Sequence, residues 1–345
     1  MLIITGGRSE EHEISIISAR SVLEVVEKTF NVTVVVITRN GHWLPFETSR
    51  RILNGDGIFQ NEECILHSTR LSGQFDVVFP LLHGTTGEDG ALQGMLELAN
   101  IPYIGSGILA SALCMDKAMA KLVLKSDNIP QVRYCLITAY NYVRDFKQFA
   151  DLRAPWFVKP VNLGSSIGIS KASNQVELFA AIDLAFKYDR RVIIEEAVPN
   201  VRELEVAIIG NDVAEVSVVG EVTYNADFYD YTTKYTEGLS HMHIPANVPL
   251  TITRQVQDLS IKIFRLLDCS DFARMDFFYQ ESSGDIFFNE VNTIPGFTLL
   301  SMFPKLWNIS GINYISLIRK LVDFAIERHK KQQLHSIKQI LHHTK

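Results

Sequence analysis

Short apolar runs alternate with helix-like segments over the first third of the chain. Apolar runs at 2–5, 32–37 and 75–79 predict strands, and helical patterns extend to about residue 27 and begin again near residue 92. Strands separated by helices are typical of a parallel sheet, whose ligands bind at the loops after the carboxyl ends of the strands. Two polar loops that contain glycine, GGRSEEHE and LLHGTTGEDG, follow predicted strands at that edge.

The remainder of the chain predicts two further units that mix strands and helices. The second unit opens with a helix over MDKAMAKLVLKSDNIPQ, which ends at Pro130. Its other predicted elements are a helix at 176–187 and strands at 132–136, 156–159 and 191–195. The third unit has predicted strands at 205–209 and 215–222, a helix at 252–267, a hairpin and a long terminal helix. We therefore expect an α/β unit at 1–113, followed by α+β units at 114–200 and 201–345.

The segment RMDFFYQESSGDIFFNEVNTIPGFT, at 274–298, predicts two strands joined by a turn at ESSGD. Arg274 and Asp276 share one face of the first strand, and Glu290 and Asn292 share one face of the second. Pairing that is symmetric about the turn places Asp276 opposite Glu290. Facing carboxylates destabilise a strand pair, and Mg²⁺ would remove their repulsion because it prefers oxygen ligands. An amphipathic hairpin with its polar face in solvent is the alternative that this segment alone leaves open.

A second group of residues has the composition of a phosphate site. In FVKPVNLGSSIGIS, Lys159 ends a predicted strand, and the loop beyond it carries the hydroxyl donors Ser165 and Ser166 between two glycines. The loop lacks both the GK[ST] ending of a Walker A motif and the strand–glycine–helix order of a dinucleotide loop. A plain turn is the alternative. Lys117, near the start of its helix, is a further candidate cation, and Glu203 is a candidate acceptor for ribose hydroxyls.

The composition of the chain mainly argues against certain classes of protein. The chain of 345 residues has a formal net charge of −6, which argues against a general nucleic-acid or membrane-surface role. Its four cysteines are scattered without a CxxC pair, which favours reduced thiols in a cytoplasmic protein. No apolar run is long enough for a signal peptide or a membrane span. The segment after Glu327 has basic but no acidic residues, which indicates a solvated, partly helical end or, alternatively, a docking segment.

Several motifs stand in a fixed order along the chain. They are GGRSEEHEIS, LLHGTTGEDGALQGMLELANIPYIGSG, MDK, VKPVNLGSSIGIS, RELEVAIIG, FYDYTTKY, IPA, RMDFFY and NEVNTIPGFT. Together they resemble the D-alanine–D-alanine ligases, a family of the ATP-grasp superfamily, from about residue 2 to the terminal helix. The resemblance implies an ATP-grasp fold and an enzyme that joins two D-alanines through an acyl phosphate, for peptidoglycan precursor synthesis. It also implies a homodimer that pairs through the first unit.

On this resemblance, ATP binds between the second and third units. The residues implied for ATP binding are Lys117, Lys159, Ser165, Ser166, Glu195, Glu196, Glu203 and Lys234. The resemblance assigns Asp276, Glu290 and Asn292 to two Mg²⁺ ions, or Mn²⁺, that bridge the phosphates. Glu196 stands where some relatives carry a basic residue, so a contact through its backbone alone is expected there.

The resemblance also implies catalytic and substrate-binding roles. The catalytic residues implied are Glu13, Ser165, Tyr235 and Arg274, and the substrate contacts implied are Glu13, His83, Arg274, Gly296 and Ser301. Glu13 would accept the ammonium group of the first D-alanine, and capping of its helix is an alternative or additional role. Arg274 and the backbone N–H of Gly296 would face the developing oxyanion, and Ser301 would contact the carboxylate of the second D-alanine.

The Tyr- and Gly-containing segment 225–240 is the expected lid, which would close with Lys234 and Tyr235 turned inward. Within the resemblance, Tyr235 favours an amine over D-lactate as the second substrate, while D-serine stays open. The rival from another class is a nucleotide-binding regulatory protein on the same fold. Such a protein should have lost some metal ligands or cations, and this sequence has them all.

Overall fold

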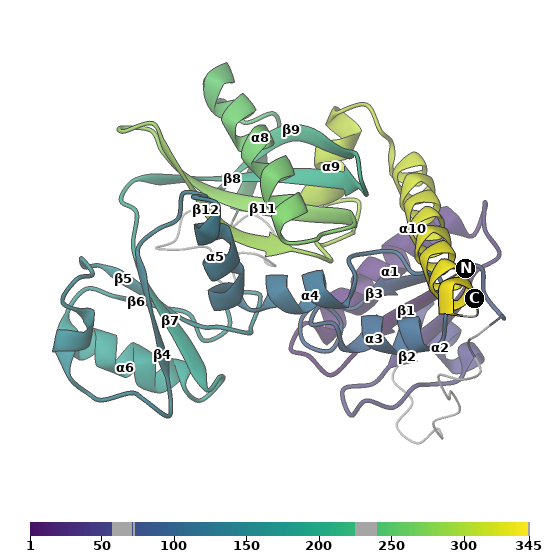
Figure 1. The fold of residues 1–345 in the computed structure, drawn as a ribbon, viewed down its shortest axis with the longest axis horizontal. Helices are drawn as coiled ribbons and strands as arrows, with labels where there is room; N and C mark the ends of the chain where they lie inside the picture. The colour runs from purple at the N-terminus through teal and green to yellow at the C-terminus, as the bar shows by residue number, and fades with distance from the viewer. Residues whose placement is uncertain (57–70, 72, 225–239, 344–345) are drawn as a thin grey trace.

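Three separate sheets organise the chain (Figure 1). The computed structural model describes residues 1–56, 71, 73–224 and 240–343, with side chains through residue 334. The sheets have the strand orders β2-β1-β3, β4-β7-β5-β6 and β10-β9-β8-β11-β12. The order of the three sheets along the chain agrees with the expected α/β unit followed by two α+β units. The exact boundaries between the units stay predictions.

The first sheet is parallel, as its alternation of strands and helices predicts. Its strands are β1 (Leu2–Gly6), β2 (Thr33–Ile37) and β3 (Val78–Leu81), and its helices are α1 (His12–Val26), α2 (Phe46–Leu53), α3 (Ala91–Leu98) and α4 (Ile108–Met115). Every residue of β1 is buried, which explains its unbroken apolar run. The strand predicted at 75–79 begins later, because Phe75 packs beside the core without joining the ladder.

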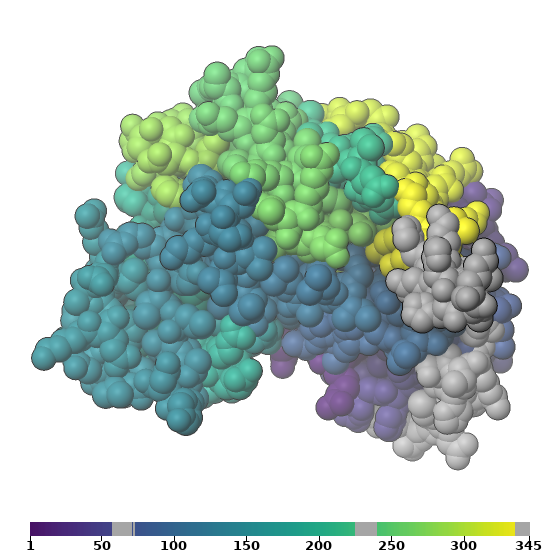
Figure 2. All heavy atoms as spheres, in the orientation of Figure 1, coloured from purple at the N-terminus to yellow at the C-terminus, as the bar shows by residue number. Residues whose placement is uncertain are grey.

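The second sheet is antiparallel and is covered by a single helix on one face. Its strands are β4 (Tyr134–Thr138), β5 (Trp156–Pro160), β6 (Ser170–Ala172) and β7 (Arg191–Glu196), with α6 (Gln175–Ala185) packed against β5 and β6. Leu178 and Ile182 of α6 meet Val158, Val192 and Ile194 in the core beneath. Figure 2 shows this unit projecting from the rest of the molecule, with a hollow between it and the purple N-terminal unit.

The third sheet is antiparallel, with helices on both faces. Its strands are β8 (Val201–Gly210), β9 (Ala214–Tyr224), β10 (Ser240–His243), β11 (Asp271–Gln280) and β12 (Asp285–Asn292). Leu204, Val206 and Ile208 pack with α8 (Leu250–Leu266), whereas Ala207 and Ile209 pack with α9 (Met302–Ile309). This alternation is the two-residue period of a strand with both faces buried.

Helix α5 (Lys117–Ser126) connects the second and third sheets. Ala120 and Leu124 bury its apolar face in the core under α8. At its other end, the N-cap residue Asp116 forms a bidentate ion pair with Arg191 of β7, at 2.6 and 2.9 Å. The helix expected to open the second unit is therefore also part of the packing of the third.

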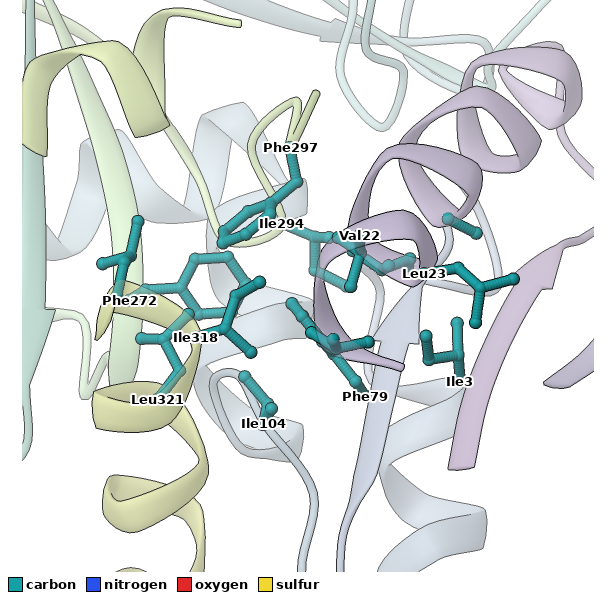
Figure 3. Close-up of a cluster of buried hydrophobic side chains, with 14 of the residues drawn as sticks. Ile3, Val22, Leu23, Phe79, Ile104, Phe272, Ile294, Phe297, Ile318 and Leu321 are labelled. Carbon is teal, nitrogen blue, oxygen red and sulfur yellow. The ribbon is translucent and has the colours of Figure 1, made fainter. Parts of the chain in front are cut away.

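The N-terminal unit and the third sheet share one hydrophobic core (Figure 3). Phe79 of β3 meets Phe297 edge to face, with ring centroids 5.4 Å apart, and Phe272 of β11 lies 5.8 Å from the same ring. Ile318 and Leu321 of the long helix α10 (Tyr314–His343) close the cluster. The loop after β12 is thereby fixed against the first sheet. In the described part of the chain, no helix is long and apolar enough to cross a membrane.

The β11–β12 hairpin confirms the predicted pairing of its polar residues. Asp276 lies opposite Glu290 and Arg274 opposite Asn292, as symmetric pairing requires. A β-bulge then shifts the register, so that Phe277 pairs with Phe288. The bulge was not predicted, although the adjacent polar residues Asn289 and Glu290 interrupt the alternation of β12 at that point.

Candidate active site

The three predicted metal ligands lie together on one face of the hairpin. Arg274 donates from Nε and Nη2 to the two oxygens of Asp276, each at 2.7 Å, and Asn292 Nδ2 donates to Asp276 Oδ2 at 2.9 Å. Glu290 Oε2 is 3.5 Å from Lys117 Nζ. The described residues hold no group of three His, Cys, Asp or Glu side chains arranged for a metal. Two carboxylates and an amide oxygen nevertheless suit Mg²⁺, which usually takes few protein ligands beside substrate phosphates.

Arg274 has a second carboxylate partner that sequence reasoning missed. Its Nε is 2.9 Å from Glu205 Oε2, on the neighbouring strand β8. Burial opposes the charge of Arg274, but Asp276 and Glu205 raise its pKa well above the ordinary value. Arg274 is thus a fixed cation on the hairpin face that carries Asp276. Glu205 lies two residues after Glu203 and shares its face of β8, which was the available signal.

A buried carboxylate joins two lysines beside this face. Glu195 Oε1 is 2.8 Å from Lys121 Nζ, and Glu195 Oε2 is 2.7 Å from Lys159 Nζ. Burial would raise the pKa of Glu195, but Lys121 and Lys159 together lower it to about 2. The Glu195 side chain, which is implied for ATP binding, is therefore an ionised partner of both lysines. Sequence reasoning missed Lys121, although its place one helical turn after Lys117 puts both on one face.

Glu196 points to the other face of β7, as alternation requires. Its Oε1 accepts from the backbone N–H of Arg153 at 2.9 Å and pairs with Arg133 at 3.3 Å. Glu203, the predicted ribose acceptor, accepts a hydrogen bond from Tyr224 at 2.5 Å.

The glycine–serine loop adopts strained backbone conformations over the site. Ser165 and Ser166 have φ of 49° and 59°, in the left-handed region that residues with a side chain rarely adopt. Such strain persists where surrounding contacts fix the loop. Lys117 Nζ donates to the Leu163 carbonyl at 2.6 Å, and the Ser165 hydroxyl donates to the Glu11 carboxylate. The loop therefore contacts both helix α5 and the N-terminal unit.

The structure places the Glu13 side chain away from the candidate site. Helix α1 begins at His12, so residues 11 and 13 point to opposite sides of its first turn. The Glu13 side chain is 58% exposed and pairs at 3.4 Å with Arg39 in solvent. Glu11 is buried instead and meets Ser165. The loop GGRSEEHE offers three acids, and only the start of the helix decides which of them faces inward.

Two side chains tie the loop after β3 to the loop after β12. His83 is buried, with Nδ1 2.9 Å from the Ile294 carbonyl and Nε2 2.9 Å from the Ser18 hydroxyl. Because a carbonyl only accepts, Nδ1 carries the proton and Nε2 accepts from Ser18. Burial lowers the pKa of His83. Glu88, which sequence reasoning missed, accepts from the backbone N–H groups of Gly84 at 2.7 Å and Ile294 at 3.0 Å.

The loop after β12 also carries the remaining predicted substrate contacts. The Ser301 hydroxyl accepts from the Thr298 N–H at 3.1 Å, immediately before α9. Gly296 lies against it, because a side-chain carbon at that position would come within 3.1 Å of Ser301 Oγ. Lys234, Tyr235 and most of the expected lid lie outside the described residues.

A cavity of about 1020 Å³ lies elsewhere, between the end of α3, the end of α8 and α10. It is lined by residues such as Tyr103, Cys269 and Arg328, and by none of the predicted site residues. We therefore place the candidate active site at the polar face of the β11–β12 hairpin and at the neighbouring Lys117 and Lys159.

Comparison with known proteins agrees with this fold. Residues 1–106 match the family described as D-ala D-ala ligase N-terminus, and residues 123–323 match D-ala D-ala ligase C-terminus. A D-alanine–D-alanine ligase from Deinococcus radiodurans is 49% identical over 333 residues, covering 95% of this chain and 98% of that relative. One from Acetivibrio thermocellus is 42% identical, covering 95% and 96%.

Solved structures of related ligases have the same fold. The VanG D-Ala:D-Ser ligase from Enterococcus faecalis has a TM-score of 0.82 at 37% identity, covering 94% of this chain and 98% of that one. The D-alanine-D-alanine ligase from Coxiella burnetii has a TM-score of 0.83 at 30% identity, covering 100% and 98%. The expected ATP-grasp architecture is confirmed, and the chain belongs to the D-alanine–D-alanine ligase family.

Proposed function

We propose that this chain is an ATP-dependent ligase that joins two D-alanines into D-alanyl-D-alanine for peptidoglycan synthesis, releasing ADP and phosphate. The observation that carries the proposal is the meeting of two elements: the carboxylate face of the β11–β12 hairpin and the lysines of α5 and β5. Their contact is the 3.5 Å approach of Lys117 to Glu290. Cations for phosphates and oxygen ligands for a divalent metal stand side by side there.

The first step needs an activated carboxylate, because an acid and an ammonium ion do not condense unaided in water. Transfer of the γ-phosphoryl group of ATP to the first D-alanine would give an acyl phosphate. Lys117 and Lys159 would neutralise charge on the phosphates, and the loop holding Ser165 and Ser166 would cover them. We place the ribose at Glu203 and the adenine beside the β7 end that carries Glu195 and Glu196.

The donor set of Asp276, Glu290 and Asn292 fits Mg²⁺ or Mn²⁺, and we propose that it holds two ions. Bound there, the metal would supply positive charge at the phosphates. Arg274 holds the Asp276 carboxylate in one orientation through both oxygens. The amide nitrogen of Asn292 donates to the same carboxylate, so the amide oxygen is its ligating atom.

The second step would place the amine of the second D-alanine against the acyl phosphate. We assign the ammonium group of the first D-alanine to Glu11, with Ser165 as its partner and His83 nearby. Arg274 and the Gly296 N–H would stabilise the tetrahedral oxyanion. Ser301 would bind the carboxylate of the second D-alanine.

We place Lys234 and Tyr235 in the lid that excludes water from the acyl phosphate. Since the substrate ATP is a cytoplasmic metabolite, we place the enzyme in the cytoplasm, and we propose a homodimer that pairs through the first unit. Sedimentation of the purified chain at several concentrations tests the dimer, and a monomer throughout would refute it.

The similarity to a D-Ala:D-Ser ligase makes D-serine a second candidate for the second substrate. Product analysis distinguishes the candidates when ATP and D-alanine are mixed with D-serine or with D-lactate. We expect D-alanyl-D-alanine as the main product in both mixtures. A dominant ester or a dominant D-alanyl-D-serine would replace the assignment.

The central experiment measures phosphate release from ATP and Mg²⁺ with D-alanine or L-alanine. We expect release that depends on D-alanine and is not supported by L-alanine. Release that ignores D-alanine would instead indicate a nucleotide-binding protein with another role.

A further inference from the structure

Lys121 is a charged side chain enclosed in the protein. It is 1% exposed, on the face of α5 that also carries Lys117. A buried ammonium group is costly unless it is paired, and an apolar side chain of similar size often serves stability as well. The presence of lysine at this position therefore calls for a reason other than packing.

The partner of Lys121 is shared with a residue of the proposed ATP site. Glu195 gives one oxygen to Lys121 at 2.8 Å and the other to Lys159 at 2.7 Å. Glu195 lies on β7 between β4 and β5, so its backbone is fixed on both sides. The ring of Tyr134 on β4 covers Lys121, with Nζ 5.5 Å from the ring centroid.

The charge of this cluster depends on Lys121. Glu195 and Lys159 alone would form a neutral pair, and a neutralised Lys159 would attract phosphate weakly. Lys121 adds a second positive charge, so the three groups together carry one net positive charge. Lys121 itself does not reach the glycine–serine loop, whereas Lys117 contacts both that loop and Glu290.

We propose that Lys121 is a positioning residue for ATP: it binds one oxygen of Glu195, so that this carboxylate holds Lys159 in place without cancelling its charge toward the phosphates. The inference rests on the proposed function, because it assigns Lys159 to nucleotide phosphate. Lys121 acts only through Glu195 and touches no substrate.

The test compares Lys121→Met, Lys121→Arg and the matched control Lys125→Met, which replaces an exposed lysine of the same helix. Calorimetry measures the Kd for ATP without D-alanine, and steady-state kinetics measures KM for each substrate and kcat. We expect Lys121→Met to raise the Kd and KM for ATP about tenfold, with KM for D-alanine changed less than about twofold. Lys121→Arg should recover most of the loss, and Lys125→Met should match the unmodified enzyme.

The double variant Lys121→Met/Glu195→Gln separates charge from packing. It removes one positive and one negative charge, so the cluster again carries one net positive charge, and the amide oxygen of the new side chain can still accept a hydrogen bond from Lys159. We expect its ATP affinity to recover relative to Lys121→Met alone. This variant also keeps the test usable if Lys121→Met does not fold, because it removes the carboxylate whose Oε1 oxygen loses its partner in Lys121→Met.

Two results would overturn the inference. One is a Lys121→Met enzyme of lower thermal stability whose Kd for ATP is unchanged, which would make the residue merely structural. The other is a double variant that binds ATP as weakly as Lys121→Met or more weakly. An unmodified enzyme that binds ATP but shows no D-alanine-dependent phosphate release would contradict the proposed function alone, since the binding comparison still stands.

Discussion

Individual carboxylates at the hairpin face are held close together because cations compensate each of them. Asp276 and Glu290 face each other across two strands, which by itself would destabilise the pair. Arg274 binds the first through two hydrogen bonds, and Lys117 approaches the second. Removing charge from either acid should therefore change binding chemistry more than folding.

Glu290→Gln should abolish turnover while leaving the fold intact, because it removes a proposed metal ligand without changing side-chain size. Phosphate release with ATP, Mg²⁺ and D-alanine measures the activity, and thermal unfolding monitors the fold. Near-normal turnover in the variant would contradict the metal assignment.

Glu11→Gln and Glu13→Gln form a matched pair within one helical turn. Glu11 is buried against Ser165, so its loss should lower kcat/KM for D-alanine roughly tenfold to a hundredfold, as expected for a charged hydrogen bond. Glu13 pairs with Arg39 in solvent, and such pairs contribute little, so Glu13→Gln should stay within about twofold. Equal losses in the two variants would reject the reassignment.

The bulge in the β11–β12 hairpin decides which side chains of β12 face the site. In β12 the core face is held by Ile286, Phe288 and then Val291, three positions after Phe288. Without the extra residue, strict alternation would turn Glu290 and Asn292 toward the core. The bulge therefore presents both side chains to the site while Phe277 and Phe288 stay buried, and bulges are common beside active sites.

The loops after β3 and β12 form a second functional element, joined through Glu88. Glu88→Ala would leave the N–H groups of Gly84 and Ile294 without their acceptor, which should cost about 2 kcal/mol of unfolding free energy. It should also lower activity, because Ile294 precedes Gly296 in the proposed oxyanion site. Urea unfolding measures the first effect and phosphate release the second.

Glu88→Gln is the control, since its amide oxygen can still accept one of the two bonds. We expect a smaller loss of stability than in Glu88→Ala. Equal stability of all three proteins would mean that these bonds do not join the loops.

Across the entire chain, the N-terminal unit, the third sheet and α10 are joined by one core and one polar network. Asp271, at the start of β11, is fully buried and accepts from the Gly105 N–H at 2.8 Å. Arg328 of α10 lies 3.4 Å from the same carboxylate and donates to the Tyr103 carbonyl at 2.7 Å. Burial raises the pKa of Asp271 to about 7, although Arg328 and Gly105 act to lower it.

This shift predicts a pH dependence of stability. Asp271 binds its proton more tightly in the folded chain than in the unfolded one, so its contribution to stability falls as the pH rises through the folded pKa. Asp271→Asn cannot ionise. Its unfolding free energy should therefore improve relative to the unmodified protein by roughly 2 kcal/mol between about pH 5 and about pH 8. Urea unfolding at the two pH values measures this change. The same difference in unfolding free energy between the variant and the unmodified protein at both pH values would contradict the prediction.

The sequence was sufficient to predict those features that depend on residues within one strand, turn or loop. The parallel order of the first sheet, the pairing of Asp276 with Glu290 and the loop beyond Lys159 follow from alternation, turn residues and motif order. These features depend on neighbours in sequence, and strand period and turn chemistry are local properties. The family motifs then supplied the chemistry that periodicity alone left open.

Only the folded chain decided which of several similar side chains face the site. The choice of Glu11 over Glu13 depends on where a helix begins, and the Lys121–Glu195–Lys159 cluster joins residues from three elements. Glu88 and Glu205 gained their roles from partners far along the chain or on a neighbouring strand. Burial and long-range pairing determine the partners of these charged side chains. Both arise from packing between elements, which cannot be read from the order of residues along the chain.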